Sequence, residues 1–242
     1  MIRYSYRCDK GGREKNQDSV LCVNKGDNYL FSVADGLGGY EDSALASFVV
    51  HETLKEFFLT EYTDDDPGFL ADAVNISQRM LAYIKKEKRV SASYTTLVIL
   101  LISGDKAQWC HVGDSRLYYL HDGHIVTRTR DHSIPQTLFE AGMIKEEEIR
   151  RHPDRSKLLR ALGRDDKEIN ADISEAQRLK RGDSFLLCTD GFWENVTEEE
   201  IEDSFITFAD TQDCLKAMET SVKDAGMESK TDNYTAICIR CD

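Results

Sequence analysis

Aspartates next to apolar, strand-like runs constrain the possible folds of this chain more than any other feature. Asp35 and Asp190 each end such a run and precede a glycine. Asp232 stands just before the last run, and Asp114 follows another one. Strand ends are held by rigid backbone, and carboxylates that point at one place repel one another unless cations lie between them. Hard divalent cations prefer oxygen ligands, so the pattern indicates a hydrolytic site with several metal ions at the ends of sheet strands.

The size and composition of the chain favour one domain with an acidic surface. Its 242 residues include 40% hydrophobic residues and only three prolines, which allows a continuous core. The chain has 31 basic and 44 acidic residues, and its net charge is −13. This charge disfavours nucleic acids and anionic membranes as partners. Most of the acids are expected to be ordinary surface charge.

The cysteines and the apolar runs indicate a reducing compartment. Seven cysteines occur without a Cys-x-x-Cys motif or a zinc-ligand spacing, and four of them lie inside apolar runs. The N-terminus lacks the apolar region of a signal peptide. The longest apolar run, residues 97–102, is far shorter than the ~20 residues that cross a bilayer. We therefore expect a cytoplasmic protein with no membrane partner.

Hydrophobic periodicity divides the chain into strand pairs and helices. It predicts strands over residues 19–24, 29–34, 95–102, 107–112, 117–121, 125–128, 185–189 and 234–240. It predicts helices over 43–58, 70–84 and 211–225. Asp122-Gly123 predicts a tight hairpin, and the charged residues 131–165 are expected to cross the surface. Hairpins separated by a helix pair favour antiparallel sheets covered by helices.

Five blocks in sequence order carry a family resemblance. They are Arg13–Asp18, Val33–Gly39, Val112–Arg116, Thr189–Gly191 and Asp232–Asn233. This ordered set resembles the metal-dependent protein phosphatases of type 2C in their single-domain bacterial form. The resemblance implies an α+β fold, a four-layer αββα sandwich of two antiparallel sheets flanked by helix pairs. It further implies a single domain over residues 1–242, with a flap subdomain near residues 131–165.

The resemblance also implies a metal site with Mn²⁺ or Mg²⁺, two ions in its core and a third, weaker ion. The residues expected to hold metal are Asp18, Asp35, Gly36, Asp114, Asp190 and Asp232. Asp35 is the candidate bridge between the two core ions, with Gly36 offering its carbonyl oxygen. Asp190 and Asp232 complete the second ion's shell, Asp18 holds one of its waters, and Asp114 binds the third ion.

The implied activity is hydrolysis of phosphoserine and phosphothreonine in proteins, in opposition to a serine/threonine kinase. A hydroxide that bridges the two ions attacks phosphorus directly. Arg13, Asp35 and Asp190 are the candidate catalytic residues, and Arg13 is also the substrate clamp because its planar guanidinium can grip two phosphate oxygens. Leu37 stands where some relatives carry a proton-donating histidine, so the general acid stays open. Glu194 has a possible role at the third ion.

Each candidate also has a structural interpretation. An Asp-Gly step is a common turn, Asp114 can cap a turn, and Arg13 can be an exposed arginine. Asn16 is interpreted as turn-stabilising, and Asp131-His132 as a hydrogen-bonding pair of the flap. The alternative function is a catalytically silent module that binds phosphoproteins. A calcium-binding structural protein is disfavoured, because residues 64–66 indicate a solvated or helix-capping turn rather than a short ligand loop.

Overall fold

Strand-like runs become two antiparallel sheets, and amphipathic runs become the helices that cover them. The computed structural model describes every residue except 38–42, 65, 91, 165–168, 227–230 and 242. The strands are β1 (Ile2–Asp9), β2 (Asp18–Lys25), β3 (Asn28–Leu37), β4 (Tyr94–Thr95), β5 (Leu97–Ser103), β6 (Lys106–Val112), β7 (Arg116–His121), β8 (His124–Arg128), β9 (Asp172–Ile173), β10 (Gln177–Arg178), β11 (Asp183–Cys188) and β12 (Tyr234–Cys241). The helices are α1 (Ser43–Glu61), α2 (Phe69–Lys88), α3 (Ile134–Glu140), α4 (Glu146–Ile149), α5 (Asp190–Trp193), α6 (Glu198–Thr207) and α7 (Thr211–Gly226).

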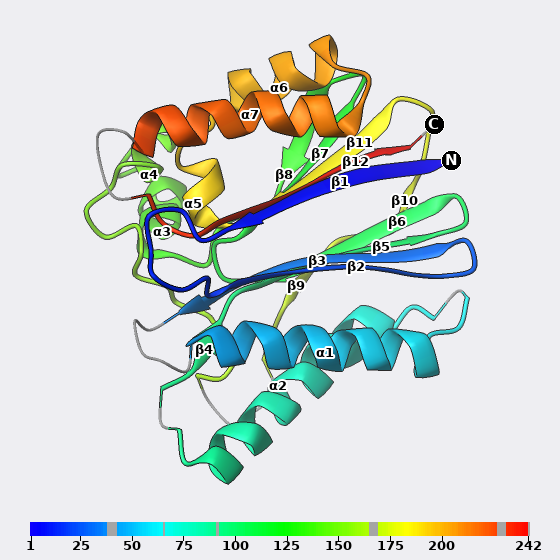
Figure 1. The fold of residues 1–242 in the computed structure, drawn as a ribbon, viewed down its shortest axis with the longest axis vertical. Coiled ribbons are helices and arrows are strands. Elements are labelled where there is room, and N and C mark those ends of the chain that lie inside the picture. Colours follow the sequence, from blue (N-terminus) through cyan, green and yellow to red (C-terminus); the bar gives the residue numbers. More distant parts are fainter. Residues whose placement is uncertain (38–42, 65, 91, 165–168, 227–230, 242) are drawn as a thin grey trace.

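The elements stack in four layers, as Figure 1 shows. The first sheet has the order β1-β12-β11-β7-β8. The second has the order β10-β6-β5-β3-β2, with β4 attached to β3 and β9 to β6. Helices α6 and α7 cover the first sheet, and α1 and α2 cover the second. The expected α+β fold with an αββα sandwich is therefore confirmed.

Three apolar clusters hold the layers together. One lies between α1, α2 and the second sheet, with Leu54, Phe58 and Ile99 among its members. A second lies between α6, α7 and the first sheet. The third joins the two sheets and includes Phe31 and Phe185. Burial of these side chains is the main stabilising contribution and fixes how the sheet ends meet.

Most of the predicted elements are present, and the exceptions are informative. The Asp122-Gly123 hairpin is confirmed, with φ of 50° and 86° at its two residues. The predicted strand 95–102 is instead two strands, because at Thr96 the chain leaves its pairing with β3 and bonds Asp35. Strand β1 and helix α6 were not predicted. Strand β1 lies at a sheet edge, and its residues are half-buried or exposed, so its apolar pattern is weak.

The structure also gives the state of the cysteines and the length and polarity of the helices. All seven cysteines are free, and five of them are buried. Across the described ranges, every helix is too short or too polar to span a lipid bilayer.

Candidate functional site

The aspartates singled out in the sequence meet at one end of the sandwich. Asp18, the first residue of β2, is the register partner of Asp35 in β3. Asp190 begins α5 directly after β11, and Asp232 lies two residues before β12. These strand ends lie on the same side of the molecule, beside α5 and the short helices α3 and α4 (Figure 1). We call Asp18, Asp35, Asp114, Asp190 and Asp232 the carboxylate cluster.

Two threonines fix the main chain at Asp35. The Asp35 amide donates to Thr96 Oγ1 at 2.9 Å, and the Thr95 hydroxyl donates to the Asp35 carbonyl at 2.9 Å. Strand β3 continues through Gly36, which pairs with Thr95. The structural interpretation of an Asp-Gly step as a turn therefore does not apply to Asp35-Gly36. This step is the point where β3 passes from one neighbouring strand to another, which leaves the Asp35 carboxyl at the sheet end.

Asp190 lies close to the segment before β12 because of the glycine that follows it. A Cβ atom on Gly191 would collide with the carbonyl oxygen of Asn233, so a larger residue would push the two segments apart. The Thr189 hydroxyl donates to Asp18 Oδ2 at 2.8 Å and links the two sheets at this point. The Asn233 side chain accepts from the Gln17 amide at 2.9 Å. These bonds join the N-terminal loop, β11 and β12 around the cluster.

Asp114 is held by a buried network of three side chains, those of Trp193, Arg116 and Asp131. Trp193 Nε1 donates to the Asp114 carbonyl at 2.9 Å, and the Arg116 guanidinium lies 3.5 Å from the centre of the Trp193 ring. Arg116 also forms two hydrogen bonds with Asp131, at 2.9 and 2.8 Å. Asp131 therefore has a structural role, as its interpretation in the sequence allowed. The network fixes the loop and leaves the Asp114 carboxyl free to face the cluster.

The carboxylate cluster is electrostatically strained. Burial raises the pKa of Asp35 well above its ordinary value, and repulsion by Asp190, Asp18, Asp114 and Asp232 raises it further. Burial raises the pKa of Asp18 to about 7. The pKa of Asp114 is raised well above its ordinary value, mainly by burial and by Asp190. Oδ1 of Asp18 and Oδ1 of Asp114 are buried and have no hydrogen-bond partner.

An all-oxygen set with unsatisfied buried acceptors fits hard divalent cations. A buried acceptor without a donor costs free energy, and a buried anion costs more, unless a cation or a proton compensates it. Several divalent ions would supply that compensation. Gly36 lies next to the cluster, and its amide donates to Gln17 O at 3.1 Å.

Two arginines reach the cluster from its rim. Arg13 Nη2 lies 2.7 Å from Asp232 Oδ2, and the Arg13 side chain is 57% exposed. Arg155 lies 3.5 Å from Asp190 Oδ2 and also pairs with Glu194. Arg13, the candidate substrate clamp, therefore lies exposed at the edge of the carboxylate cluster. Arg155 was not anticipated, because it is one of several bases in the charged segment 131–165 and no local pattern separates it from the others.

Further predicted residues have ordinary structural partners. Asn16 Oδ1 accepts from the Asp18 amide at 3.1 Å, which confirms its turn-stabilising role. Leu37 ends β3. Asp131 and His132 lie at the start of the flap segment, and residue 165 at its end lies outside the described residues.

A second group of possible metal ligands lies nearby. His111, His132 and Asp172, which we call the histidine cluster, offer ligand atoms within 4.8 Å of one another. The Gly113 amide donates to His132 Nδ1 at 3.1 Å, and His132 Nε2 lies 3.3 Å from both Asp172 Oδ2 and Arg160 Nη1. Arg160 donates to Asp172 Oδ1 at 2.7 Å. The histidine cluster therefore already has a cation beside its carboxylate, and both imidazole rings have hydrogen-bond partners.

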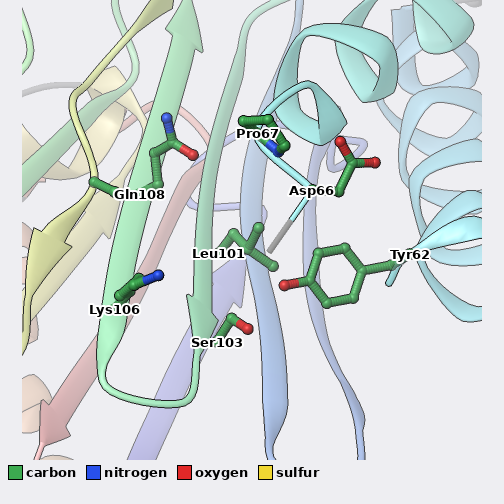
Figure 2. A pocket seen from close by; sticks show the side chains of 8 residues that line it. Tyr62, Asp66, Pro67, Leu101, Ser103, Lys106 and Gln108 are labelled. Atoms are coloured by element: carbon green, nitrogen blue, oxygen red, sulfur yellow. The ribbon is translucent and has the colours of Figure 1, made fainter. Parts of the chain in front are cut away.

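A hollow of about 180 Å³ lies at the other end of the second sheet (Figure 2). Its lining includes Leu101, Ser103 and Lys106 of the β5–β6 hairpin, together with Tyr62 and Asp66. The hairpin turn lies at the end of β5 and β6 opposite to Val112, which leads to Asp114. None of the predicted site residues lines this hollow.

Comparisons with known proteins agree on one family. The family model described as "Protein phosphatase 2C" matches residues 11–225. The serine/threonine protein phosphatase PstP of Mycobacterium tuberculosis is 32% identical over 238 residues, which cover 96% of this chain and 44% of that protein. The chain thus spans less than half the length of that relative.

Solved structures show the same architecture. The crystal structure of the serine/threonine phosphatase Stp1 from Staphylococcus aureus superimposes with a TM-score of 0.89 and 26% identity, covering 100% of this chain and 96% of the other. The catalytic domain of PstP in complex with two manganese ions superimposes with a TM-score of 0.83 and 28% identity, covering 99% and 97%.

Proposed function

This chain belongs to the protein phosphatase 2C family, and we propose that it is a metal-dependent protein serine/threonine phosphatase whose residues 1–242 form one domain. Its substrates are phosphoserine and phosphothreonine in proteins, and it acts in the cytoplasm against a serine/threonine kinase. The relatives' names support this substrate class, since both PstP and Stp1 are called serine/threonine phosphatases.

One observation carries the proposal: carboxylates from distant parts of the sequence converge with unsatisfied buried oxygens. Asp35, Asp190 and Asp232 would hold two Mn²⁺ or Mg²⁺ ions, together with the Gly36 carbonyl and a water on Asp18. Asp114 would hold a third, weaker ion. The manganese-bound structure of PstP supports this choice of ion. Bound divalent ions supply Lewis acidity and lower the pKa of water, so that a nucleophile forms near neutral pH.

The side chains at the rim bind and orient the substrate. The exposed guanidinium of Arg13 can leave Asp232 for the phosphate oxygens once other cations compensate the acids. Arg155 holds the flap segment against Asp190 and Glu194, at the edge of the same cluster. The acids repel a bare phosphate, so these two arginines and the bound cations together make phosphate binding favourable.

The alternative of a catalytically silent phosphoprotein-binding module is disfavoured by the complete set of acids. It would not need five carboxylates in a strained cluster, whose free-energy cost the binding of cations recovers.

The test is manganese-dependent hydrolysis of para-nitrophenyl phosphate and of a phosphothreonine peptide, with and without a chelator. We expect turnover that requires the metal and disappears in Asp190→Asn. Folded protein that binds Mn²⁺ and releases no phosphate from either compound would establish the silent module instead.

A further inference from the structure

The outer face of the α1–α2 pair carries an apolar groove that no part of the described chain covers. The groove has a volume of about 450 Å³. Its apolar lining consists of Phe48, Val49, Phe57, Ile76, Met80 and Ile84. Figure 1 shows α2 leaving α1 at an angle, so that the two helices diverge toward the end of the molecule where β4 lies. We call this surface the α1–α2 groove.

On α2 the groove is lined by a second apolar stripe, distinct from the one that faces the core, whereas Val49 and Phe57 of α1 line the groove and also pack against the core. Ile76, Met80 and Ile84 follow one another at four-residue spacing on α2, whereas the core-facing residues of α2 include Leu70, Val74 and Leu81. Phe48 is 59% exposed and Met80 39% exposed. A helix with one partner needs one apolar stripe, so a second, contiguous stripe indicates a further partner.

The other helix pair lacks such a surface. Among the described residues of α6 and α7, Ile206 is the one exposed large hydrophobic side chain. Both pairs cover a sheet in the same way, so exposure of apolar side chains on α1 and α2 is not a general consequence of the fold.

The charge along the groove is of one sign. Glu52, Glu56 and Glu61 line it, and no basic residue belongs to the described lining. Lys55 lies 3.9 Å from Glu52 on the exposed side of α1, outside the lining. With an apolar floor and an acidic edge, the groove complements a helix that has an apolar face bordered by lysine or arginine. A second copy of this chain fits less well, because each copy has a net charge of −13.

We infer that the α1–α2 groove binds a basic amphipathic helix of another protein. The apolar face of that helix packs on Phe48, Met80 and Ile84, and its basic residues face Glu52 and Glu56. Figure 1 shows that α1 starts at the end of the molecule where the strand ends that carry the carboxylate cluster lie. The inference concerns binding alone and does not depend on the proposed phosphatase activity.

The experiment uses a fluorescent peptide of lysine and leucine about five turns long, with its leucines on one helical face. A scrambled peptide of the same composition, which cannot place its leucines on one face, is the control. Fluorescence anisotropy with the whole chain should show saturable binding of the first peptide and at least about tenfold weaker binding of the second.

Variants then locate the binding surface. Met80→Gln and Phe48→Ser remove apolar contacts from different helices, and Glu56→Lys reverses the acidic edge; each should weaken binding about tenfold. Leu59→Ser, which is exposed on α1 outside the groove lining, and Glu199→Lys on α6 should leave binding unchanged. All substitutions are at exposed or half-buried positions, and unfolding curves check the fold of each variant.

Several outcomes would overturn the inference. Equal binding of the two peptides would indicate charge attraction without a groove. Unchanged binding in both Met80→Gln and Phe48→Ser would place the peptide elsewhere. A dimer in sedimentation experiments that dissociates in Met80→Gln would show that a second copy, not a foreign helix, occupies the groove. Each result can be read whether or not the chain hydrolyses phosphate esters.

Discussion

The carboxylate cluster and the histidine cluster contain residues that bind metals in many proteins, yet they differ in how their charges are compensated. In the carboxylate cluster, burial and mutual repulsion raise the pKa values of Asp18, Asp35 and Asp190. In the histidine cluster, Arg160 pairs with Asp172, and main-chain groups bind both imidazole rings. The arginines at the rim of the first cluster leave its buried acids uncompensated, whereas the carboxylate of the second cluster already has a cation beside it.

Residue type alone gives the same prediction for both clusters, whereas charge compensation predicts a metal site only at the first. A cation stabilises a buried acid that has no hydrogen-bond donor. A neutral, hydrogen-bonded imidazole must first give up a proton or a hydrogen-bond partner before it can bind a metal. The state of each ligand atom is therefore a better criterion than the distance between ligand atoms. The predictions below test the comparison from the largest expected effect to the smallest.

The largest effect is expected from Asp190→Asn or Asp35→Asn. Each substitution keeps the size of the side chain and removes one charge that the cations need, so activity should fall by more than about 100-fold. Hydrolysis of para-nitrophenyl phosphate over a range of Mn²⁺ concentrations measures the change. The chain should stay folded by circular dichroism, and nearly normal activity at low Mn²⁺ would contradict the assignment.

Arg13→Ala should weaken the binding of substrate more than that of metal. Arg13 is exposed and pairs with Asp232 through one contact of 2.7 Å, so its loss leaves the cluster in place. We expect KM for a phosphothreonine peptide to rise about tenfold, which corresponds to about 1.4 kcal/mol, with little change in the Mn²⁺ affinity. Arg178→Ala is the matched control, because Arg178 of β10 forms an exposed pair with Asp105 of the β5–β6 turn, away from the cluster. A loss of Mn²⁺ affinity equal to the loss of substrate affinity would contradict this role.

The convergence of the aspartates could be expected from the sequence because rigid elements place them. Asp35 and Asp190 follow apolar runs whose burial fixes the ends of β3 and β11, so their convergence follows from the stacking of the sheets. The two-sheet architecture itself came from the family resemblance, since periodicity alone indicated only antiparallel sheets with helices. The local geometry was less predictable: Asp35 lies inside a strand that changes partners, and Asp190 begins a helix.

Long-range contacts of flexible side chains could not be predicted. Arg155 and Asp190 are 35 positions apart in the sequence, and the fold of the charged flap segment brings them together. The histidine cluster likewise joins β6, the start of the flap segment and β9, a strand of two residues with no recognisable period. Such contacts depend on how loops cross the surface, which neither periodicity nor turn propensity specifies.

The metal-free stability of the two clusters should depend on pH in opposite directions. Because the pKa of Asp18 is raised to about 7, its stabilising contribution is complete below the ordinary value of 3.8 and is lost as the pH rises toward 7. Burial lowers the pKa of His132 to about 4, so its contribution is present above the ordinary value of 6.5 and is lost as the pH falls toward 4. Raising the pH from about 5 to about 7.5 should therefore weaken the first cluster and strengthen the second.

Two variants separate these contributions when melting temperatures are measured with a chelator present. Asp18→Asn keeps an acceptor for the Thr189 hydroxyl and removes the charge, so Tm near pH 7.5 should rise by a few degrees relative to the unsubstituted chain. His132→Gln removes the titrating imidazole, so its change in Tm relative to the unsubstituted chain should be more favourable near pH 5 than near pH 7.5. If Asp18→Asn lowers Tm at both pH values by the same amount, repulsion within the cluster is not what limits metal-free stability.

The smallest effect on metal binding is expected from changes in the histidine cluster. Asp172→Asn removes a carboxylate that Arg160 already compensates, so no bound cation loses a ligand and Mn²⁺ affinity should change less than about twofold. Isothermal titration of Mn²⁺ into the chain measures this, with Asp190→Asn as the positive control for a lost ligand. Zn²⁺ is titrated in parallel, because imidazole nitrogen suits it better than Mn²⁺. If Asp172→Asn or His111→Ala removes one equivalent of bound Mn²⁺ or Zn²⁺, the histidine cluster is a metal site despite Arg160, and charge compensation is not a sufficient criterion for separating the two clusters.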